Sequence, residues 1–322
     1  MSEQRPAASL RVTVSGASGL IGASLVAALR ERGAQVTVLT RDPDRARARL
    51  PLRGRAGEIE AVAWDPSSEP APAAALAGRD GVVHLAGEPI AQRWSERVKH
   101  AIRESRVTGT HNLVAGLVQA EPRPPTLVSA SAIGYYGPHG EEPLDEDAPA
   151  GTDFLARVCA EWEAAASRAR ELPHAGTGGV RVVQVRTGVA LDRAGGALAK
   201  MLPAFRLGLG GPVAGGRQYV SWIHTRDVLG IMLAALTDER WNGPVNATAP
   251  EPVTNRELSK ALGRVLHRPA LAPVPALALR TLYGEMAEIV TSGARVLPAK
   301  ALVLGYEFAY PQLEPALRAA LS

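Results

Sequence analysis

Three glycines spaced three residues apart stand near the start of the chain, in the segment Ser15-Gly16-Ala17-Ser18-Gly19-Leu20-Ile21-Gly22. The segment follows a short apolar, β-branched run and opens a run with helical apolar spacing, a context in which a glycine pattern indicates dinucleotide binding. The first glycine permits a tight turn, the second lets the backbone approach a pyrophosphate, and the third lets helix and strand pack closely. The helix N-terminus then offers free N–H groups and a positive dipole end to the phosphates. An ordinary glycine-rich turn is the alternative, since the spacing is Gly-x-x-Gly-x-x-Gly instead of Gly-x-Gly-x-x-Gly.

The residue at the end of the next predicted strand distinguishes the two nicotinamide dinucleotides. A site that prefers NAD usually has an acidic residue there, which binds the ribose 2′-hydroxyl. This strand ends Leu39-Thr40-Arg41, and the Arg41 guanidinium would bind a 2′-phosphate with charge-assisted, fork-like hydrogen bonds. Asp42 follows directly and leaves NAD open, and a solvated surface position is the alternative for Arg41. We predict NADP(H) as the cofactor.

An alternating pattern of strands and helices is needed to position these motifs, and the first 190 residues supply it. The alternation predicts an α/β fold, with a parallel sheet, right-handed crossovers and helices on both faces. Residues 173–179, rich in glycine, are expected to form a loop insert. The expected strands span residues 10–15, 35–40, 59–64, 81–86, 126–130 and 181–186, and the expected helices span residues 20–32, 95–118 and 154–171.

The regular alternation weakens after about residue 190. We therefore predict a doubly wound Rossmann domain over residues 1–190, with sheet contributions from about residues 218–250. A smaller substrate lobe is predicted over residues 191–322, ending in a proline-interrupted helical segment from about residue 271. A lobe placed over the carboxyl ends of the strands creates a cleft, which is where ligands bind in such sheets.

The composition excludes several classes of protein. The chain has 322 residues, 46% of them hydrophobic, and its net charge of +4 contains no block of like charges, so we expect neither a nucleic-acid nor a membrane partner. Residues 1–8 are expected to be a short polar overhang, and the longest apolar run, residues 228–236, is far too short to cross a bilayer. A single cysteine, Cys159, fits a reducing compartment, and we predict a cytoplasmic location. The seven histidines show no metal-ligand spacing, so no metal site is expected.

Further motifs make the chain resemble a known family. His84-Leu85-Ala86-Gly87 ends the fourth predicted strand, Ser129-Ala130-Ser131 ends the fifth, and residues 219–227 resemble the strand-His-x-x-Asp segment of nucleotide-sugar epimerases. With the glycine pattern, these motifs resemble an extended short-chain dehydrogenase/reductase. Residues 129–137, 159–163 and 215–224 are similar to its atypical branch, the epimerase family proteins of the SDR39U type. The resemblance covers residues 10–321, and the C-terminal part is similar to that branch's small domain of unknown function.

The resemblance implies a set of cofactor contacts and a homodimer formed through a pair of helices. It implies that Asp65 approaches the adenine, that Arg41 binds the 2′-phosphate, and that Ser129 or Ser131 lies near the nicotinamide. The other implied contacts are with the pyrophosphate, from Gly16, Ser18, Gly19, Leu20, Ile21 and Gly22, and with the adenosine ribose, from Leu85, Ala86 and Gly87.

The chain departs from the superfamily where the chemistry is expected. The superfamily carries a Tyr-x-x-x-Lys pair on the helix after the fifth strand, in which the phenol transfers a proton and the lysine lowers the phenol pKa. The chain contains no Tyr-x-x-x-Lys, and none of its four lysines lies between residues 100 and 199. The register of Glu163 places Leu155 at the Tyr position and Cys159 at the Lys position. A leucine cannot carry a proton, and a cysteine cannot supply a permanent positive charge.

Four residues are candidates to replace the missing pair. Arg106 stands where the family usually has Asn and would restore a positive charge, and Cys159 would act as an acid or base if a neighbour such as Arg106 lowered its pKa. Tyr135 is a candidate proton donor, and Ser131 a candidate hydrogen-bond donor to a substrate carbonyl. The alternatives are a surface position for Arg106 and simple packing for Cys159 and Tyr135.

The substrate side of the predicted cleft carries weaker signals. Arg217 follows a glycine-rich loop and would bind an anionic substrate, as Lys200 would, with a loop-surface position as the alternative. His224 is expected to be structural. The candidate substrate contacts are Tyr136, Lys200, Arg217, Gln218 and Trp222.

Two functions stay open at this point. The first is an NADP-dependent oxidoreductase or sugar-nucleotide epimerase-like enzyme with a rearranged proton relay, whose substrate is a nucleotide sugar or another carbonyl compound. The second is a non-catalytic NADP(H)-binding sensor or scaffold, favoured by the loss of Tyr and Lys, because hydride chemistry on a carbonyl needs a proton partner. The fold alone cannot decide between them.

Overall fold

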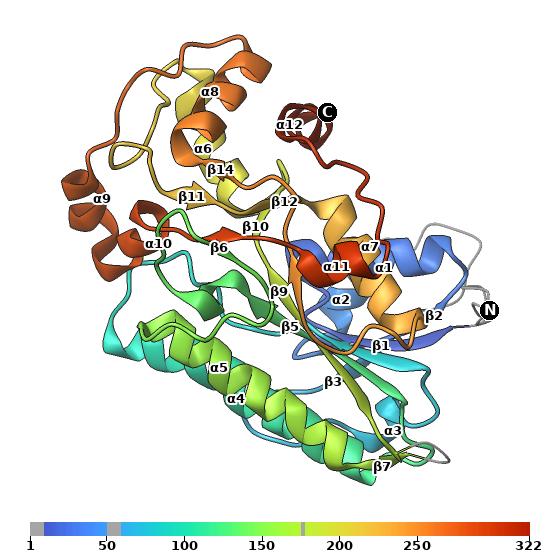
Figure 1. Cartoon of the computed structure of the whole chain (residues 1–322). Helices are drawn as coiled ribbons and strands as arrows, with labels where there is room; N and C mark the ends of the chain where they lie inside the picture. Colours follow the sequence, from blue (N-terminus) through green and yellow to red (C-terminus); the bar gives the residue numbers. More distant parts are fainter. Residues whose placement is uncertain (1–9, 50–58, 175–177) are drawn as a thin grey trace.

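The computed structural model describes residues 10–49, 59–174 and 178–322, and the predicted overhang at residues 1–8 lies outside this part of the chain. A sheet of seven parallel strands forms its centre, in the order β13-β9-β5-β4-β1-β2-β3 (Figure 1). The sequence runs outward from β1 to β3 on one side and from β4 on the other, so the order reverses between β1 and β4, where such sheets bind ligands. The strands are β1 (Arg11–Ser15), β2 (Gln35–Thr40), β3 (Glu60–Ala63), β4 (Gly81–His84), β5 (Thr126–Ala132), β9 (Arg181–Thr187) and β13 (Gly243–Ala247).

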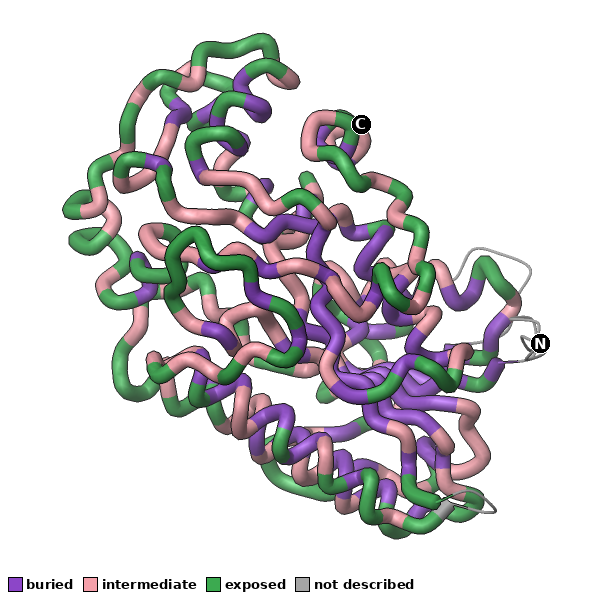
Figure 2. Tube along the Cα trace, in the orientation of Figure 1, coloured by how far each residue is buried: buried purple, intermediate pink, exposed green. Residues whose placement is uncertain are grey.

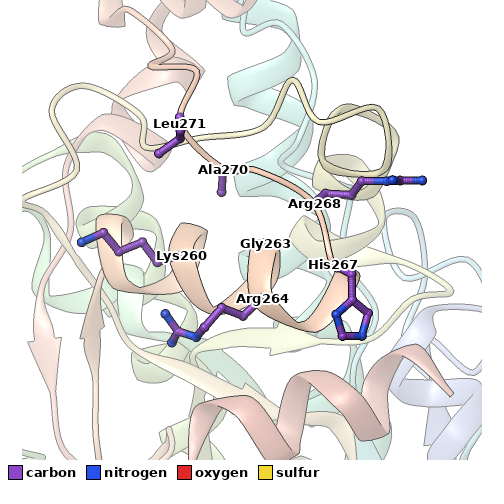
Figure 3. Close-up of a pocket in the computed structure, with 7 residues that line it drawn as sticks. All are labelled: Lys260, Gly263, Arg264, His267, Arg268, Ala270 and Leu271. Carbon is purple, nitrogen blue, oxygen red and sulfur yellow. The ribbon is translucent and has the colours of Figure 1, made fainter.

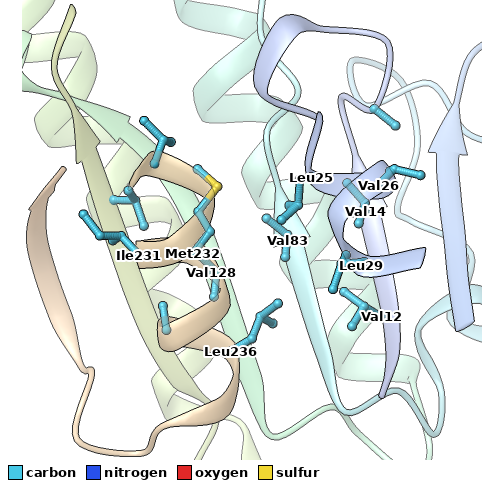
Figure 4. Packing of buried hydrophobic residues seen from close by; sticks show 14 of the residues in the cluster. Val12, Val14, Leu25, Val26, Leu29, Val83, Val128, Ile231, Met232 and Leu236 are labelled. Carbon is cyan, nitrogen blue, oxygen red and sulfur yellow. The ribbon is translucent and has the colours of Figure 1, made fainter. Parts of the chain in front are cut away.

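Helices cover both faces of the sheet, and each face has its own apolar cluster. One cluster joins the strands to α1 (Leu20–Glu31), α2 (Pro43–Arg49) and α7 (Thr225–Thr237). The other lies under α3 (Ala73–Leu76), α4 (Glu96–Gln119) and α5 (Phe154–Ser167). Figure 2 shows that the buried residues concentrate in the central strands. Figure 4 shows the first cluster, with Val12, Val14, Leu25, Val26, Leu29, Val83, Val128, Ile231, Met232 and Leu236 labelled.

A smaller lobe lies beyond the carboxyl ends of the strands. A third apolar cluster joins α6 (Gly196–Arg206), α8 (Asn255–Leu266) and α12 (Leu313–Leu321), and two short two-stranded sheets cross its base. The chain leaves the main sheet after β9, builds part of this lobe, and returns for β13 before forming α8. The short strands are β10 (Val189–Leu191) with β12 (Trp222–His224), and β11 (Tyr219–Val220) with β14 (Val253–Thr254).

The C-terminal segment is tied to the rest of the molecule through buried acidic side chains. Asp227 is fully buried at the start of α7, and its carboxylate accepts hydrogen bonds from the backbone N–H groups of Ala309 and Tyr310, at 2.7 and 3.1 Å. Glu146 accepts from the N–H groups of Asn246 and Lys300, which joins β13 to α11. The remaining elements of this segment are α9 (Ala276–Tyr283), η4 (Gly284–Ala287), α10 (Glu288–Thr291), β15 (Arg295–Val296), which pairs with β6 (Pro143–Leu144), and α11 (Ala299–Val303).

The predicted Rossmann-type α/β fold is confirmed, with small differences at the element ends. The strand expected over residues 81–86 ends at His84, and the helix expected over residues 154–171 ends at Ser167 and continues as the 3-10 helix η3 (Arg168–Glu171). The expected loop insert contains the short strands β7 (Pro173–His174) and β8 (Gly178–Gly179), while residues 175–177 lie outside the described part. No helix among the described residues is long and apolar enough to cross a membrane.

Candidate cofactor and active site

The glycine turn between β1 and α1 is closed by backbone approaches that leave no room for a side chain. Gly16 has a φ of +72°, and a Cβ there would lie 2.5 Å from the backbone carbon of Leu85. A Cβ on Gly22 would lie 2.2 Å from the Gly16 carbonyl oxygen. Gly19 is different, because its Cβ would meet only that same oxygen, at 3.4 Å, and Gly19 caps α1 without a side-chain hydrogen bond from the described residues. The turn is therefore tight at its base and open at Gly19, which fits a dinucleotide pyrophosphate.

Charged side chains gather where β2 and β3 end. Arg41 is exposed directly after β2. Two hydrogen bonds from Ser67, then one from Ser68 and lastly the charge of Arg41, hold the pKa of Asp65 below its usual value. Asp42 accepts a hydrogen bond from the backbone N–H of Arg45, at 2.9 Å, and so caps the start of α2. Asp42, the acidic residue that kept NAD as an alternative cofactor, thus caps a helix and does not pair with Arg41.

Arg106 lies under the segment that follows β4. Its guanidinium donates to the carbonyl oxygens of Glu88 and Ile102, at 3.0 and 3.1 Å, and lies 5.2 Å from the centre of the Trp162 ring. A Cβ on Gly87 would lie 3.2 Å from the Arg106 Cζ. Burial lowers the pKa of Arg106, but a guanidinium stays charged in proteins. The structure thus places a fixed cation beside the segment that the resemblance assigns to the adenosine ribose.

The positions of the missing Tyr and Lys face the end of β5. Helix α5 begins after Asp153, whose side chain accepts hydrogen bonds from the N–H groups of Leu155 and Ala156. A Cβ on Gly134, in the 3-10 helix η2 (Ile133–Tyr136), would lie 3.6 Å from the Leu155 Cβ and 3.9 Å from the Cys159 sulfur. The two replaced side chains therefore point at the turn after β5, where an apolar group and a thiol stand.

The Cys159 thiol does not meet the condition set for an acid or base. Its side chain is buried, and burial followed by the charge of Glu163 raises its pKa to about 12. Arg106 acts in the opposite direction, but its effect is smaller than that of burial. The condition for Cys159 to act as an acid or base, a net lowering of its pKa, is therefore not met, because desolvation of the thiolate outweighs the attraction of Arg106.

Native protein is consequently expected to resist alkylation at this single cysteine. The thiolate is the reactive form, and both its burial and its raised pKa keep it scarce. We expect iodoacetamide to modify the native protein about 100-fold more slowly than the protein in concentrated guanidinium chloride, as followed by intact mass. Equal rates in the two conditions would show an accessible thiolate and would restore Cys159 as a proton-transfer candidate.

Ser131 belongs to a buried ionic network that the sequence did not reveal. Its hydroxyl donates to Glu163 Oε1 at 2.6 Å. Arg186, on β9, donates to both oxygens of the same carboxylate, at 2.8 and 2.9 Å. The Ser131 proton is therefore directed to Glu163 and away from a substrate carbonyl, which corrects the expected donor role. Ser129, two residues earlier on the same strand, is fully buried, and its hydroxyl lies 3.3 Å from the Ala130 carbonyl oxygen.

The two tyrosines of η2 have different surroundings. Tyr136 is fully buried, and its hydroxyl donates to Asn246 at 2.7 Å and accepts from Arg186 at 2.9 Å. Burial raises the pKa of Tyr136 to about 12, and both hydrogen bonds of its hydroxyl are made within the protein, so its contact with substrate stays a prediction. Tyr135 is half-buried, and the Arg186 guanidinium stacks on its ring at 3.5 Å. Tyr135 is thus the candidate phenol that keeps partial exposure at the end of β5.

The expected substrate residues of the lobe are dispersed. Trp222 is fully buried in the lobe's apolar cluster and donates to the Glu251 carbonyl, so its predicted substrate contact is wrong. Gln218 donates to the backbone of Val213 and Val290, which makes it a tether. The exposed side chains are Lys200, which donates to the Ala91 carbonyl at 2.8 Å, and Arg217.

His224 caps α7 by accepting from the Arg226 N–H, at 3.1 Å. Its ring centroid lies 4.2 Å from that of Tyr310, so it also contacts the C-terminal segment. Both contacts are structural. Within the described part of the chain, no group of three or more His, Cys, Asp or Glu residues could hold a metal ion.

Two surface hollows differ in their relation to these groups. One, of about 480 Å³, lies beside η2 and the start of α5 and is lined by residues 136–139 and 149–153. The other, of about 470 Å³, lies along α8 in the smaller lobe, and Figure 3 shows its basic side chains Lys260, Arg264, His267 and Arg268. Of these two hollows in the described part of the chain, the first is close to the carboxyl end of β5 and is placed to receive a group that reacts there.

Comparison with known families identifies two parts of the chain. Residues 12–247 match the NAD dependent epimerase/dehydratase family, and residues 274–320 match a domain of unknown function (DUF1731). The chain is 41% identical over 316 residues to the epimerase family protein SDR39U1 homolog, chloroplastic, of Arabidopsis thaliana, covering 97% of this chain and 87% of the relative. It is 37% identical over 314 residues to the mouse epimerase family protein SDR39U1, covering 96% and 99% of the two chains.

Solved structures show the same relation. The human epimerase family protein SDR39U1, solved with NADPH, is 33% identical, has a TM-score of 0.83, and covers 97% of this chain and 100% of that one. A nucleoside-diphosphate sugar epimerase from Corynebacterium glutamicum is also 33% identical, with a TM-score of 0.73, and this chain covers 59% of it. The chain therefore belongs to the NAD dependent epimerase/dehydratase family, as a short-chain dehydrogenase/reductase of the SDR39U type with that branch's small C-terminal domain, and it takes a nicotinamide dinucleotide cofactor.

Proposed function

We propose that this protein is an NADP(H)-dependent oxidoreductase or epimerase-like enzyme that acts on a carbonyl compound or a nucleotide sugar in the cytoplasm. The observation that carries the cofactor preference is the end of β2, where Arg41 is exposed and Asp42 is engaged in capping α2. A human relative solved with NADPH supports the same preference. The glycine turn supports the dinucleotide itself, because Gly16 and Gly22 fit only without a side chain.

The proposed reaction uses two side chains in place of the Tyr–Lys pair. The bound cofactor would supply the hydride chemistry. Arg106, held by two carbonyl oxygens and close enough to Cys159 at the Lys position for its charge to act on that thiol, would provide the positive charge that the family obtains from lysine. Tyr135 would exchange the substrate proton, with the stacked Arg186 cation stabilising the phenolate that forms. Ser131 and Glu163 would support this end of the site through their mutual hydrogen bond.

A non-catalytic sensor is the second candidate, and particular observations favour it. Leu155 cannot transfer a proton, Cys159 is a buried thiol with a raised pKa, and the Ser131 proton is directed to Glu163. In this function the protein would bind NADP(H), and the C-terminal domain would report the bound state. The two candidates share the cofactor and differ in turnover.

Replacement of Arg41 by alanine is expected to weaken NADPH binding by about 10- to 100-fold, the effect of losing charge-assisted bonds to one phosphate. NADH lacks the 2′-phosphate, so its affinity should change by less than about twofold. Cofactor fluorescence titration measures both. Arg45→Ala, an exposed arginine on α2, is the matched control and should leave both affinities unchanged. Equal losses for NADPH and NADH would show that Arg41 does not contact the 2′-phosphate.

Turnover separates the enzyme from the sensor. We expect either that the NADPH complex loses its reduced-cofactor absorbance with at least one of a panel of aldehydes and quinones, or that the NADP+ complex converts at least one nucleotide sugar to its epimer without net loss of cofactor, as followed by chromatography. Tyr135→Phe should then lower kcat by about 100-fold or more while NADPH affinity stays unchanged, because general acid–base catalysis contributes effects of that size. Tight NADPH binding without turnover across the panel would favour the sensor.

A further inference from the structure

A buried histidine pairs with the residue that precedes the glycine turn. Ser15 ends β1 and His84 ends β4, and the two residues are direct partners in the parallel pairing of these strands. Both are fully buried, and the Ser15 hydroxyl oxygen lies 2.6 Å from His84 Nδ1. The pair sits where the strand order reverses, between the two strands whose following segments form the two walls of the cofactor site.

The Ser15 hydroxyl connects these two walls. The backbone N–H of Leu85 points at Ser15, 3.2 Å from its carbonyl oxygen and 3.3 Å from its hydroxyl oxygen. Gly16 follows Ser15 directly in the glycine turn. A Cβ on Gly16 would lie only 2.5 Å from the Leu85 carbonyl carbon. A hydroxyl that rotated or moved would therefore change the spacing between the glycine turn and the segment from Leu85 to Gly87.

The chemistry of His84 suits it to fix that hydroxyl. Burial lowers its pKa to about 4, so the imidazole is neutral near neutral pH and carries one N–H and one acceptor nitrogen. Its Nε2 has no hydrogen-bond partner among the described residues, although it is buried. An unpartnered buried nitrogen is costly, and a leucine at this position would avoid that cost. The bond to Ser15 offsets that cost, because it satisfies both the imidazole Nδ1 and a buried hydroxyl.

We propose that His84 is a positioning residue for the dinucleotide: it holds the Ser15 hydroxyl and thereby sets the spacing of the glycine turn against Leu85. This inference rests on the proposed NADP(H) binding. His84 lies beneath both walls and acts on the cofactor through Ser15 and Leu85. Loss of the Ser15–His84 bond should then weaken NADPH binding more than it disturbs the fold.

Thr13 offers a matched control, because it lies two residues before Ser15 on the same strand. It is also fully buried, and its hydroxyl donates to the Ala75 carbonyl at 2.5 Å, away from the cofactor site. Thr13→Val and Ser15→Ala each remove one buried hydroxyl from β1. Both variants should lower the melting temperature. Of the two lost bonds, the one made by Ser15 connects the walls of the site, and the one made by Thr13 does not.

The test is an NADPH titration of wild type, Thr13→Val, Ser15→Ala, His84→Leu and His84→Asn, below the melting temperature of all five proteins. We expect Kd to rise about 10-fold in Ser15→Ala and His84→Leu, the size of one lost hydrogen bond, and to stay within about twofold in Thr13→Val. His84→Asn can place an amide group near the position of Nδ1, and it should recover most of the affinity. If His84→Leu does not fold, Ser15→Ala, which removes a single oxygen atom, carries the comparison.

The outcomes separate this inference from the proposed function. A wild-type protein that binds neither NADPH nor NADH would overturn both. Wild-type binding with an unchanged Kd in Ser15→Ala and His84→Leu would overturn the positioning role alone. An equal rise of Kd in Thr13→Val would also overturn it, because the effect would then follow from any weakening of β1.

Discussion

Replacement of Glu163 by glutamine is expected to lower the free energy of unfolding by about 3–5 kcal/mol, the usual effect of removing one partner of a buried ion pair. The side chain of Arg186 is 3% exposed and that of Glu163 is 11% exposed, so the guanidinium would keep its charge without a counter-charge or access to water. The new amide group would also turn an NH2 toward either Arg186 or the Ser131 hydroxyl, both of which now donate to the carboxylate. At least one buried donor would lose its acceptor.

Urea denaturation measures this loss, and the same helix provides the control. Glu161 lies two residues earlier on α5 and pairs with Arg103 at 2.7 Å, but these side chains are 42% and 46% exposed. Glu161→Gln should change the free energy of unfolding by less than about 1 kcal/mol, because exposed pairs are screened by water. Similar losses in the two variants would show that Glu163 acts through general helix packing and that its ion pair contributes little.

The secondary structure and the cofactor turn could be predicted because their signals are local. Alternating apolar runs fix the strands, and three glycines with strand and helix flanks fix the turn. The predicted strand at residues 35–40 has the bounds of β2, and the other expected strands differ from the observed ones by at most two residues. The differences lie at strand ends such as His84. There the chain leaves the sheet, but the apolar sequence pattern continues past the last paired residue.

The ionic network was missed because its members are far apart in sequence. Ser131 and Glu163 are separated by 32 residues, and Glu163 and Arg186 by 23. A local signal existed, because Arg186 lies in the mostly apolar strand β9. An arginine in such a strand is rarely buried without a charged partner. The sequence does not say which acidic residue on which helix is that partner, because this depends on how α5 crosses the sheet.

Orientation also explains the error at Trp222 and the inward-facing hydroxyl of Tyr136. Both residues lie in segments that do approach the cleft, so their place in the sequence favoured substrate contact. Their side chains point into the interior instead, toward Asn246 and the Glu251 carbonyl. An aromatic ring with one polar atom satisfies either environment, and the choice follows from packing that the sequence pattern does not encode.

Two alanine substitutions in the glycine turn should separate the effects on folding from those on cofactor binding. Gly16→Ala places a methyl group 2.5 Å from the Leu85 backbone at a φ of +72°, so β1 and the segment after β4 must move apart. We expect it to lower the free energy of unfolding by about 2–4 kcal/mol, from left-handed strain plus overpacking. NADPH affinity should fall on the order of 100-fold, because the two walls of the site would be displaced.

Gly19→Ala should leave the fold intact and still weaken cofactor binding. Its φ is −78°, and the nearest atom to the new methyl group is the Gly16 oxygen at 3.4 Å, so the free energy of unfolding should change by less than about 1 kcal/mol. The methyl group would project at the open side of the turn, where the backbone must approach the pyrophosphate, and NADPH affinity should again fall on the order of 100-fold. Urea denaturation and NADPH titration of both variants give the two quantities independently. The new methyl group would occupy the space that is assigned to the cofactor. A Gly19→Ala protein with wild-type affinity would therefore mean that the pyrophosphate does not approach this residue.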